Sequence, residues 1–194
     1  MELSDSAYTV LGMLRLGARS GYEIQRAAEA STRFFWAISP HQVYSNLAAL
    51  EAQGLIVSEQ SPRGERKRTL YELTTKGEDE LRDWVLQPGE LSFELRDLGV
   101  LKLFFADVVS NDDALELVRR MRDRSERALE QFEWKILPLA RKIQARGDAA
   151  PLMAARYGRG LQEGILAVCG ELERELEDQT ATARPPRRTR IAPR

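Results

Sequence analysis

The sequence contains few of the residues from which most catalytic and metal sites are built. Among its 194 residues there is one cysteine, Cys169, and one histidine, His41. A single cysteine cannot form an intramolecular disulfide, and these counts argue against a metal site built from His and Cys clusters. We find no Gly-rich phosphate loop, no G-x-S-x-G motif and no Cys–His pair suited to nucleophilic catalysis. We therefore expect no metal, no cofactor and no enzymatic activity.

The sequence also lacks a long apolar run and an excess of charge of either sign. No uninterrupted apolar segment is long enough to span a bilayer, and the N-terminus has no signal-type segment. We expect a cytoplasmic protein with no membrane partner. The 29 basic residues are balanced by 30 acidic ones, so attraction to nucleic acid would have to come from a local patch.

The first 86 residues carry signals for four helices and one β-hairpin. Apolar periodicity predicts helices over residues 3–16, 21–31 and 40–53, ended by glycines at 17 and 54 in the first and third cases. Strand-like runs at 55–57 and 69–73 flank a Pro-Arg-Gly turn, and a fourth helix ends before the break at 87–89. Three capping-box pairs support the helix starts: Ser20 with Glu23, Ser39 with Gln42, and Thr75 with Glu78. This order is typical of a winged helix-turn-helix.

The third predicted helix has the pattern of a recognition helix. Val43, Leu47 and Leu50 are spaced to pack inward, and the polar residues crowd into the N-terminal half, which reaches base edges in the major groove. Gln can pair with adenine, and the small residues at 48–49 permit close approach to DNA. An ordinary amphipathic helix with a polar exposed face fits the same pattern. The candidate contacts are His41, Gln42, Tyr44, Ser45 and Asn46.

The hairpin turn and the start of the second helix add candidate phosphate contacts. Four cations occupy six residues of the turn, against one acid. A basic wing beside a recognition helix supplies salt-dependent affinity for the DNA backbone, although charge is also common in solvated turns. Ser20 and Tyr22 begin the second helix, whose N–H groups could donate hydrogen bonds to a phosphate; structural capping explains Ser20 equally well. The wing cations are Arg63, Arg66, Lys67 and Arg68.

After residue 94 the sequence becomes strongly helical. Residues 95–109 are rich in Leu and Phe, and Ser110 with Asp113 opens a long charged helix. Apolar residues in it alternate four- and three-residue steps, the spacing of a seam between packed helices, and Pro138 should kink or split it. A final helix follows a break at 147–148. Residues 181–194 hold five arginines, three prolines and no acid, so we expect a disordered tail. The seam comprises Leu129, Phe132, Ile136, Leu139 and Ile143. In the final helix, apolar residues recur at helical spacing: Tyr157, Leu161, Ile165, Val168, Leu172 and Leu176.

Four segments resemble the PadR family of transcription regulators: SGYEI (20–24), HQVYSNL (41–47), LEAQGLI (50–56) and RTLYELTTKG (68–77). Residues 96–97 and 101–105 more loosely resemble the start of the C-terminal domain in the longer, virulence-regulator-like branch of that family. Tyr44 matches the family's recognition-helix tyrosine and Tyr71 its wing-strand tyrosine. Ser45 stands where many members have proline, and His41-Gln42 replaces a commoner Gly-Thr or Gly-Gln pair, which affects the expected operator sequence and not the binding mode.

The resemblance implies a homodimer on double-stranded DNA, a two-fold pseudo-palindromic operator, and repression that a small-molecule effector relieves. We expect a mainly α fold with a small β-hairpin: a winged helix-turn-helix DNA-binding domain (1–86), a linker (87–94), a helical dimerisation domain (95–180) and the tail (181–194). No residue is assigned to effector binding. The expected dimer contacts are Leu101, Phe104, Phe105, Leu129, Phe132, Ile136, Leu161, Ile165 and Leu172.

Several alternatives accompany this hypothesis. A winged helix used for protein–protein contact, with the long helices as a coiled-coil adaptor, explains the neutral charge and the seam equally well, but needs neither a basic wing nor a polar recognition face. Trp36, Trp84 and Trp134 are expected in a core or interface, with stacking on a ligand as the alternative. Cys169 lies in an apolar helix and is expected to be a buried hydrophobe, with a redox-sensing thiol as the alternative.

Overall fold

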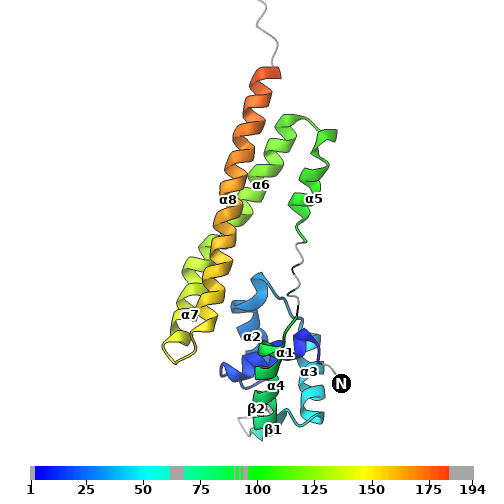
Figure 1. The fold of residues 1–194 in the computed structure, drawn as a ribbon, viewed down its shortest axis with the longest axis vertical. Helices are drawn as coiled ribbons and strands as arrows, with labels where there is room; N and C mark the ends of the chain where they lie inside the picture. Colours follow the sequence, from blue (N-terminus) through cyan, green and yellow to red (C-terminus); the bar gives the residue numbers. More distant parts are fainter. Residues whose placement is uncertain (1–2, 62–67, 90, 92, 94–95, 184–194) are drawn as a thin grey trace, which may run out of the picture. The chain divides into compact units, whose positions relative to one another are not determined.

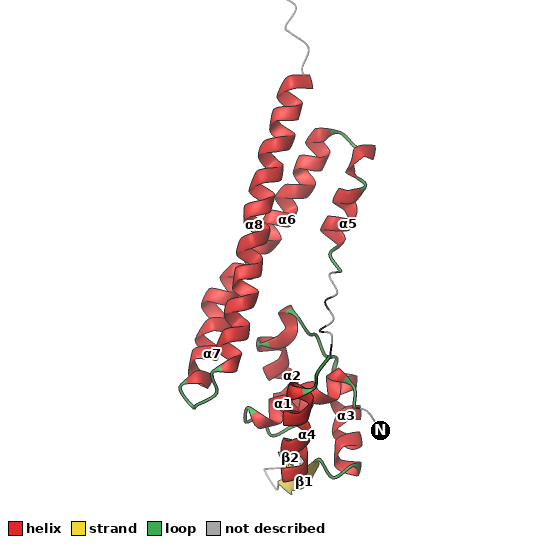
Figure 2. Ribbon diagram, viewed as in Figure 1, coloured by secondary structure: helices red, strands yellow, loops and turns green. Residues whose placement is uncertain are grey.

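A computed structural model describes residues 3–61, 68–89, 91, 93 and 96–183 of the chain. Figures 1 and 2 show that these residues are mainly helical, and the strands among them form one antiparallel hairpin. The predicted fold class is therefore confirmed. The chain divides into two compact units, one made of residues 1–92 with 135–158 and the other of residues 93–134 with 159–194. In the described residues no helix is both long enough and apolar enough to cross a bilayer.

The N-terminal elements follow the predicted order, with one short 3-10 turn added between the second and third helices. Gly17 and Gly54 end α1 and α3 at φ +98° and +69°, a left-handed conformation that glycine adopts without the steric cost of a Cβ. The elements are α1 (Asp5–Arg15), α2 (Gly21–Ala30), η1 (Thr32–Phe34), α3 (Pro40–Ala52), β1 (Ile56–Ser61), β2 (Arg68–Leu73) and α4 (Thr75–Leu86).

Two of the predicted helix caps differ in detail from the structure. At α3 the capping box is complete, because the Ser39 hydroxyl accepts the Gln42 N–H and the Gln42 side chain accepts the Ser39 N–H. At α2 the Ser20 hydroxyl accepts the Glu23 N–H, but the Glu23 carboxylate accepts the N–H of Arg19 instead of that of Ser20. The capping box predicted there is therefore wrong in its second half.

The cap of α4 lies one residue earlier than predicted. Thr74, not Thr75, caps the helix: its hydroxyl accepts the Gly77 N–H at 3.1 Å and donates to the Gly54 carbonyl at 2.8 Å. The start of α4 is thereby fastened to the end of α3. A Cβ on Gly77 would overlap the backbone oxygen of Leu55, so glycine is required for this close approach.

One apolar core holds the three N-terminal helices against the hairpin. In the strands, Ile56 pairs with Leu73 at the open end and Ser61 with Arg68 next to the turn. The inward face of α3 is buried as its spacing predicts, which leaves the opposite face of that helix outside the core. The most deeply buried side chains are Val10, Leu11, Ile24, Val43, Leu47, Leu50 and Ile56.

The C-terminal elements are built around two long antiparallel helices. Figure 1 shows α6 lying along α8, and ion pairs join Arg119 to Glu177 and Arg122 to Glu173. Ser110 caps α6 as predicted, since its hydroxyl accepts the Asp113 N–H. The elements are α5 (Leu98–Phe104), η2 (Ala106–Val108), α6 (Asn111–Gln131), η3 (Phe132–Ile136), α7 (Leu137–Gln144) and α8 (Ala150–Ala183).

Pro138 interrupts the long helix as predicted, and it does so through a π-helical turn. The turn η3 ends directly before α7, in whose first positions Pro138 lies. Proline has no N–H to donate and its ring crowds the carbonyl four residues earlier, so the backbone must depart from regular α geometry just before it.

The π turn shifts the apolar seam by one residue. The seam was predicted to run through Phe132, Ile136 and Leu139, but the buried side chains after Phe132 are Leu137 and Ala140. Ile136 and Leu139 are only half-buried. The five-residue step from Phe132 to Leu137 matches the wider π turn, so the predicted phase is correct as far as Phe132 and wrong beyond it.

The segments at the linker and the tail fall partly outside the described residues. Residues 87–89, 91 and 93 belong to no helix or strand, and α5 begins at Leu98. Helix α8 continues to Ala183, so residues 181–183 are helical and the expectation of disorder there was wrong. Residues 184–194 lie outside the described part of the chain.

Candidate nucleic-acid interface

The outward face of α3 presents polar and small side chains in a single strip. Val43, Leu47 and Leu50 fix the helix to the core, so the residues between them face away from it. The polar members lie in the first two turns, close to the N-terminal N–H groups and the positive end of the helix dipole. The exposed side chains are His41, Gln42, Tyr44, Ser45, Ala48 and Ala49.

Three of the predicted contact residues on α3 also make hydrogen bonds within the chain. The Gln42 Oε1 atom accepts the Ser39 N–H at 2.9 Å, which directs the amide toward the helix start. The Ser45 hydroxyl donates to the Gln42 carbonyl at 3.2 Å. The Asn46 side chain donates to the Ser6 hydroxyl at 3.0 Å, and it is half-buried against α1. Asn46 therefore ties α3 to α1, a role that its position in the sequence did not reveal.

The ring of Tyr44 lies against the first turn of α2. A Cβ on Gly21 would come within 2.5 Å of the Tyr44 Cε1 atom, so the ring occupies the space that any larger residue at position 21 would fill. Tyr71, on β2, has a raised pKa because of burial, with contributions from the charge of Glu51 and from Tyr44. Tyr44 thus lies against α2 while more than half of it stays exposed.

Ser20 is placed inside the protein. It is 4% exposed, and its hydroxyl accepts both the Glu23 N–H and, at 2.9 Å, a guanidinium N–H of Arg68. Arg68 also pairs with the Glu23 carboxylate. The backbone N–H of Arg19, followed by Arg68, lowers the pKa of Glu23. Ser20 and Arg68 thus join α2 to the hairpin, and we leave the Ser20 side chain out of the candidate interface.

Tyr22 is well exposed at the start of α2, and sequence reasoning missed its neighbour. The guanidinium of Arg26 lies 5.9 Å from the centroid of the Tyr22 ring, within the range of a cation–π contact. Both side chains are exposed, so a phenol and a cation face solvent from adjacent turns. The signal in the sequence was the four-residue spacing of an aromatic and an arginine at a helix start.

The wing cations Arg63, Arg66 and Lys67 lie outside the described residues.

The residues expected at a dimer interface differ in their exposure. Phe132 is 2% exposed within a single chain, so it belongs to the core and we leave it out of any interface. Ile165 and Leu172 pack against the cluster of Val118, Met121 and Cys169, and Ile136 packs against that of Leu137 and Ala140. Leu129 is half-buried. The members that remain well exposed are Leu101, Phe104, Phe105 and Leu161.

The tryptophans and the cysteine have distinct environments. Trp134 is 86% exposed and Trp36 and Trp84 are also partly exposed within a single chain, so none of the three is buried in a core, and the expectation of an interface position stays a prediction. Cys169 is buried between α6 and α8, as expected of a small hydrophobe, and burial raises the pKa of its thiol. A raised pKa lowers the thiolate fraction and with it the reactivity of the thiol.

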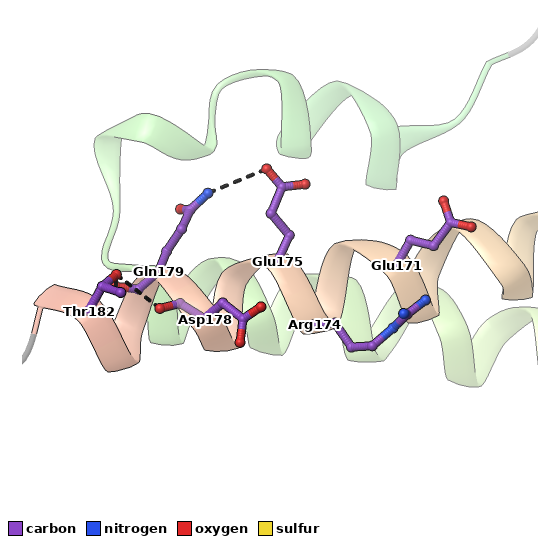
Figure 3. Close-up of a pocket in the computed structure, with 6 residues that line it drawn as sticks. All are labelled: Glu171, Arg174, Glu175, Asp178, Gln179 and Thr182. Carbon is purple, nitrogen blue, oxygen red and sulfur yellow. Dashed lines mark hydrogen bonds between the residues drawn. The ribbon is translucent and has the colours of Figure 1, made fainter.

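A groove on α8 shows no sign of a built ligand site. Figure 3 shows its lining, six polar side chains from this one helix, around a space of about 420 Å³. All six are exposed. Within the described ranges there is no group of three or more His, Cys, Asp or Glu side chains arranged to hold a metal ion. The lining residues are Glu171, Arg174, Glu175, Asp178, Gln179 and Thr182.

Comparison with known families covers both parts of the chain. Residues 10–83 match the transcriptional regulator PadR-like family, and residues 95–177 match the virulence activator alpha C-terminal domain. The chain therefore contains a PadR-like transcriptional regulator domain followed by a virulence activator alpha C-terminal domain. The PadR-like family is DNA-binding and is not a class of enzymes, and the resemblance seen in the sequence is confirmed.

Individual PadR-like proteins match nearly the full length. A curated relative, the negative transcriptional regulator PadR of Bacillus subtilis, is 28% identical over 169 residues, which are 87% of this chain and 88% of the relative. The crystal structure of B. subtilis PadR in complex with operator DNA has a TM-score of 0.79 at 21% identity, covering 91% of this chain and 99% of that one. The same protein in complex with p-coumaric acid has a TM-score of 0.70 at 22% identity, covering 88% and 98%. These similarities confirm a winged-helix fold followed by a helical region.

Proposed function

We propose that this PadR-like regulator is a homodimeric repressor that places α3 of each subunit in the major groove of a pseudo-palindromic operator. The observation that carries the proposal is the outward strip of α3, whose polar side chains project from a helix fixed to the core along its opposite face. Two recognition helices related by a two-fold axis enter successive major grooves about 34 Å apart. The B. subtilis relative that is named a negative regulator, and its structure with operator DNA, support repression through direct DNA binding.

Each side chain of the strip has a chemical role in this proposal. His41, Gln42 and Ser45 contact base edges or phosphates, and the alanines at 48–49 allow the helix to approach the groove closely. An amide oxygen has two lone pairs, so Gln42 can keep its bond to the Ser39 N–H and still offer its NH₂ group as a donor. Tyr44 and Tyr22 donate hydroxyls to phosphates.

Cations around the strip supply affinity without sequence information. Arg26 joins the proposed interface beside Tyr22. Arg63, Arg66 and Lys67 of the wing contact the backbone beside the groove, and each phosphate contact adds salt dependence. Arg68 holds α2 to the hairpin through Ser20 and Glu23, and in this way it positions the wing relative to the helices.

The dimer in this proposal forms through exposed apolar side chains of the C-terminal region, with residues 1–86 as the DNA-binding domain and 95–180 as the dimerisation domain. Phe104 and Phe105 contact each other edge to face, and both are well exposed together with Leu101. An apolar patch of this kind is costly to leave in water and marks an association surface. Leu161 on α8 extends the set.

A small molecule relieves repression in this proposal. The structure of B. subtilis PadR with p-coumaric acid supports an effector in the family. A ligand that binds one dimer geometry more tightly than the other shifts the population away from the DNA-binding form, and the size of the shift is set by its differential affinity.

Fluorescence anisotropy with the DNA upstream of the chain's own gene tests the DNA-binding step. The wild type should bind this DNA more tightly than random DNA, and its affinity should fall steeply with salt. A Gln42→Ala, Tyr44→Ala double variant should lose the specific component, whereas Tyr157→Ala, an exposed tyrosine on α8, should retain it. Equal affinity for specific and random DNA would reject the proposal in favour of a protein–protein adaptor.

Light scattering tests the dimer separately. The wild type should have the mass of two chains, and a Phe104→Ser, Phe105→Ser variant should shift toward one. A monomeric wild type at micromolar concentration would reject the proposed arrangement.

A further inference from the structure

A cavity of about 540 Å³ lies within the winged-helix residues, between the start of α1 and the end of α4. Pockets that hold small organic molecules have volumes of about 300–1,000 Å³, so this one is large enough for a bicyclic aromatic ligand. Its chemistry is set by two aromatic rings and three carboxylates. The residues that carry the argument are Asp5, Tyr8, Glu80, Asp83 and Trp84.

The two aromatic rings of the cavity are ordered by their own contacts. The rings of Tyr8 and Trp84 stack with centroids 4.6 Å apart and an interplanar angle of 10°. Tyr8 is 8% exposed and donates its hydroxyl to the Glu80 carboxylate at 2.8 Å, whereas Trp84 is 37% exposed. The indole therefore rests on a fixed phenol ring and keeps surface available to a ligand. An aromatic face fixed before binding loses little conformational entropy when a ligand stacks on it.

The charge around the rings is of one sign. Asp5, Glu80 and Asp83 all line the cavity, and none of its lining residues, all of which are described, is Lys, Arg or His. Arg82 is a nearby cation. Its guanidinium pairs with the Asp79 carboxylate at 2.8 Å, and its distance to the Asp83 carboxylate is longer, 3.7 Å. An indole face beside carboxylates attracts cations through both the ring quadrupole and the negative charge. It repels anionic ligands.

We infer that this cavity binds planar organic cations, with the aromatic body stacked on Trp84 and the positive charge facing Asp83 and Glu80. Only the suggestion that such a ligand acts as an effector rests on the proposed function. Binding itself requires no DNA. The ligand inferred for this cavity is positively charged, whereas a carboxylic acid such as p-coumaric acid is negatively charged at neutral pH.

Isothermal titration calorimetry with the full chain, without DNA, tests the inference. The probe is N-methylquinolinium, compared with quinoline, which has nearly the same shape and is neutral at pH 7.5, and with p-coumarate, which is an anion. The cation should bind at least about tenfold more tightly than quinoline, because only it gains both the cation–π and the carboxylate attraction. Equal affinity for the cation and the neutral compound, tighter binding of p-coumarate, or no binding of the cation would each overturn the inference.

Variants locate the binding. Trp84→Leu should weaken N-methylquinolinium binding about 2- to 30-fold, the range that a lost cation–π contact covers. Asp83→Asn should also weaken N-methylquinolinium binding. Asp83 is exposed and Asn has nearly the same shape, so this change leaves the stack of Tyr8 and Trp84 intact. The controls Asp112→Asn, on α6, and Trp134→Leu alter exposed residues of the same types outside the cavity and should bind as the wild type does. Unchanged affinity in both Trp84→Leu and Asp83→Asn would overturn the assignment even if DNA binding were normal.

Discussion

Replacing Gln42 by Glu should separate the two roles of this side chain in α3. The structure uses the Gln42 Oε1 atom as the acceptor of the Ser39 N–H, at 2.9 Å, and a carboxylate oxygen can accept the same hydrogen bond. Glu in the first turn of a helix also interacts favourably with the positive end of the helix dipole. The proposed interface, in contrast, uses the NH₂ group of Gln42, which Glu lacks. Folding and DNA binding should therefore respond in opposite directions.

The magnitudes follow from the contacts on each side. For folding, the cap is kept and the dipole term adds about 0.3–1 kcal/mol of stability at neutral pH. For binding, the loss of one base-edge donor costs about 1–3 kcal/mol, which weakens affinity roughly 5- to 150-fold, and repulsion from phosphate adds to this loss. Gln42→Ala should instead lose about 0.5–2 kcal/mol of stability with part of the cap, and lose DNA binding as well.

Urea unfolding and fluorescence anisotropy on the same preparations measure both quantities. Gln144→Glu, on α7, makes the same change in net charge outside the proposed interface and should leave operator affinity within about twofold of the wild type. If Gln42→Glu bound the operator as tightly as the wild type, Gln42 would not be a DNA contact. If it were markedly less stable, the capping interpretation would fail instead.

Three further predictions concern stability and reactivity. Gly77→Ala should lower the free energy of unfolding by about 1–3 kcal/mol because the new methyl group overlaps the backbone oxygen of Leu55. Gly12→Ala, at a helical position with nothing within 4 Å of the new methyl group, should raise it by about 0.5–1 kcal/mol. Urea unfolding that shifted the stability of both variants in the same direction would contradict this. Hydrogen bonding to Arg124 holds the pKa of Asp97 below its ordinary value. The pair's stabilisation is therefore complete above the ordinary carboxyl pKa of about 4 and is lost as pH falls through the folded-state pKa. Asp97→Asn should cost about 1 kcal/mol at pH 7 and converge with the wild type in acid, and a difference independent of pH would refute the pairing. Burial raises the pKa of Cys169, so a disulfide reagent at pH 8 should modify the folded chain at least about 100-fold more slowly than the urea-unfolded chain, and similar rates would show that the thiol is accessible.

The sequence was sufficient for the features that depend on neighbouring residues. Helix α3 was predicted from Ser39, Pro40 and Gln42 at its start and a glycine at its end, and the structure contains the complete capping box. The inward spacing of Val43 and Leu47 gave the core face of the same helix. These signals act over one or two turns, so no knowledge of the tertiary structure was needed to interpret them.

The features that depend on distant partners could not be predicted. Glu23 was expected to close a capping box with the Ser20 N–H, but its carboxylate accepts the Arg19 N–H and pairs with Arg68, 45 residues later in the sequence. Asn46 was placed among the DNA contacts, and its amide binds the Ser6 hydroxyl, 40 residues earlier. In both cases a residue far away in the sequence binds the side chain, and a local pattern carries no information about such a partner.

The π turn η3 makes the long C-terminal helices unequally sensitive to changes in length. Each residue added to or removed from an α-helix rotates everything that follows by about 100°. A deletion within α6 would therefore turn Leu137 and Ala140 away from the helix they pack against. A deletion inside η3 would shorten the step from Phe132 to Leu137 from five residues to four, which is the spacing of one face of an ordinary α-helix. At η3 the chain can lose a residue and keep the apolar side chains on either side aligned.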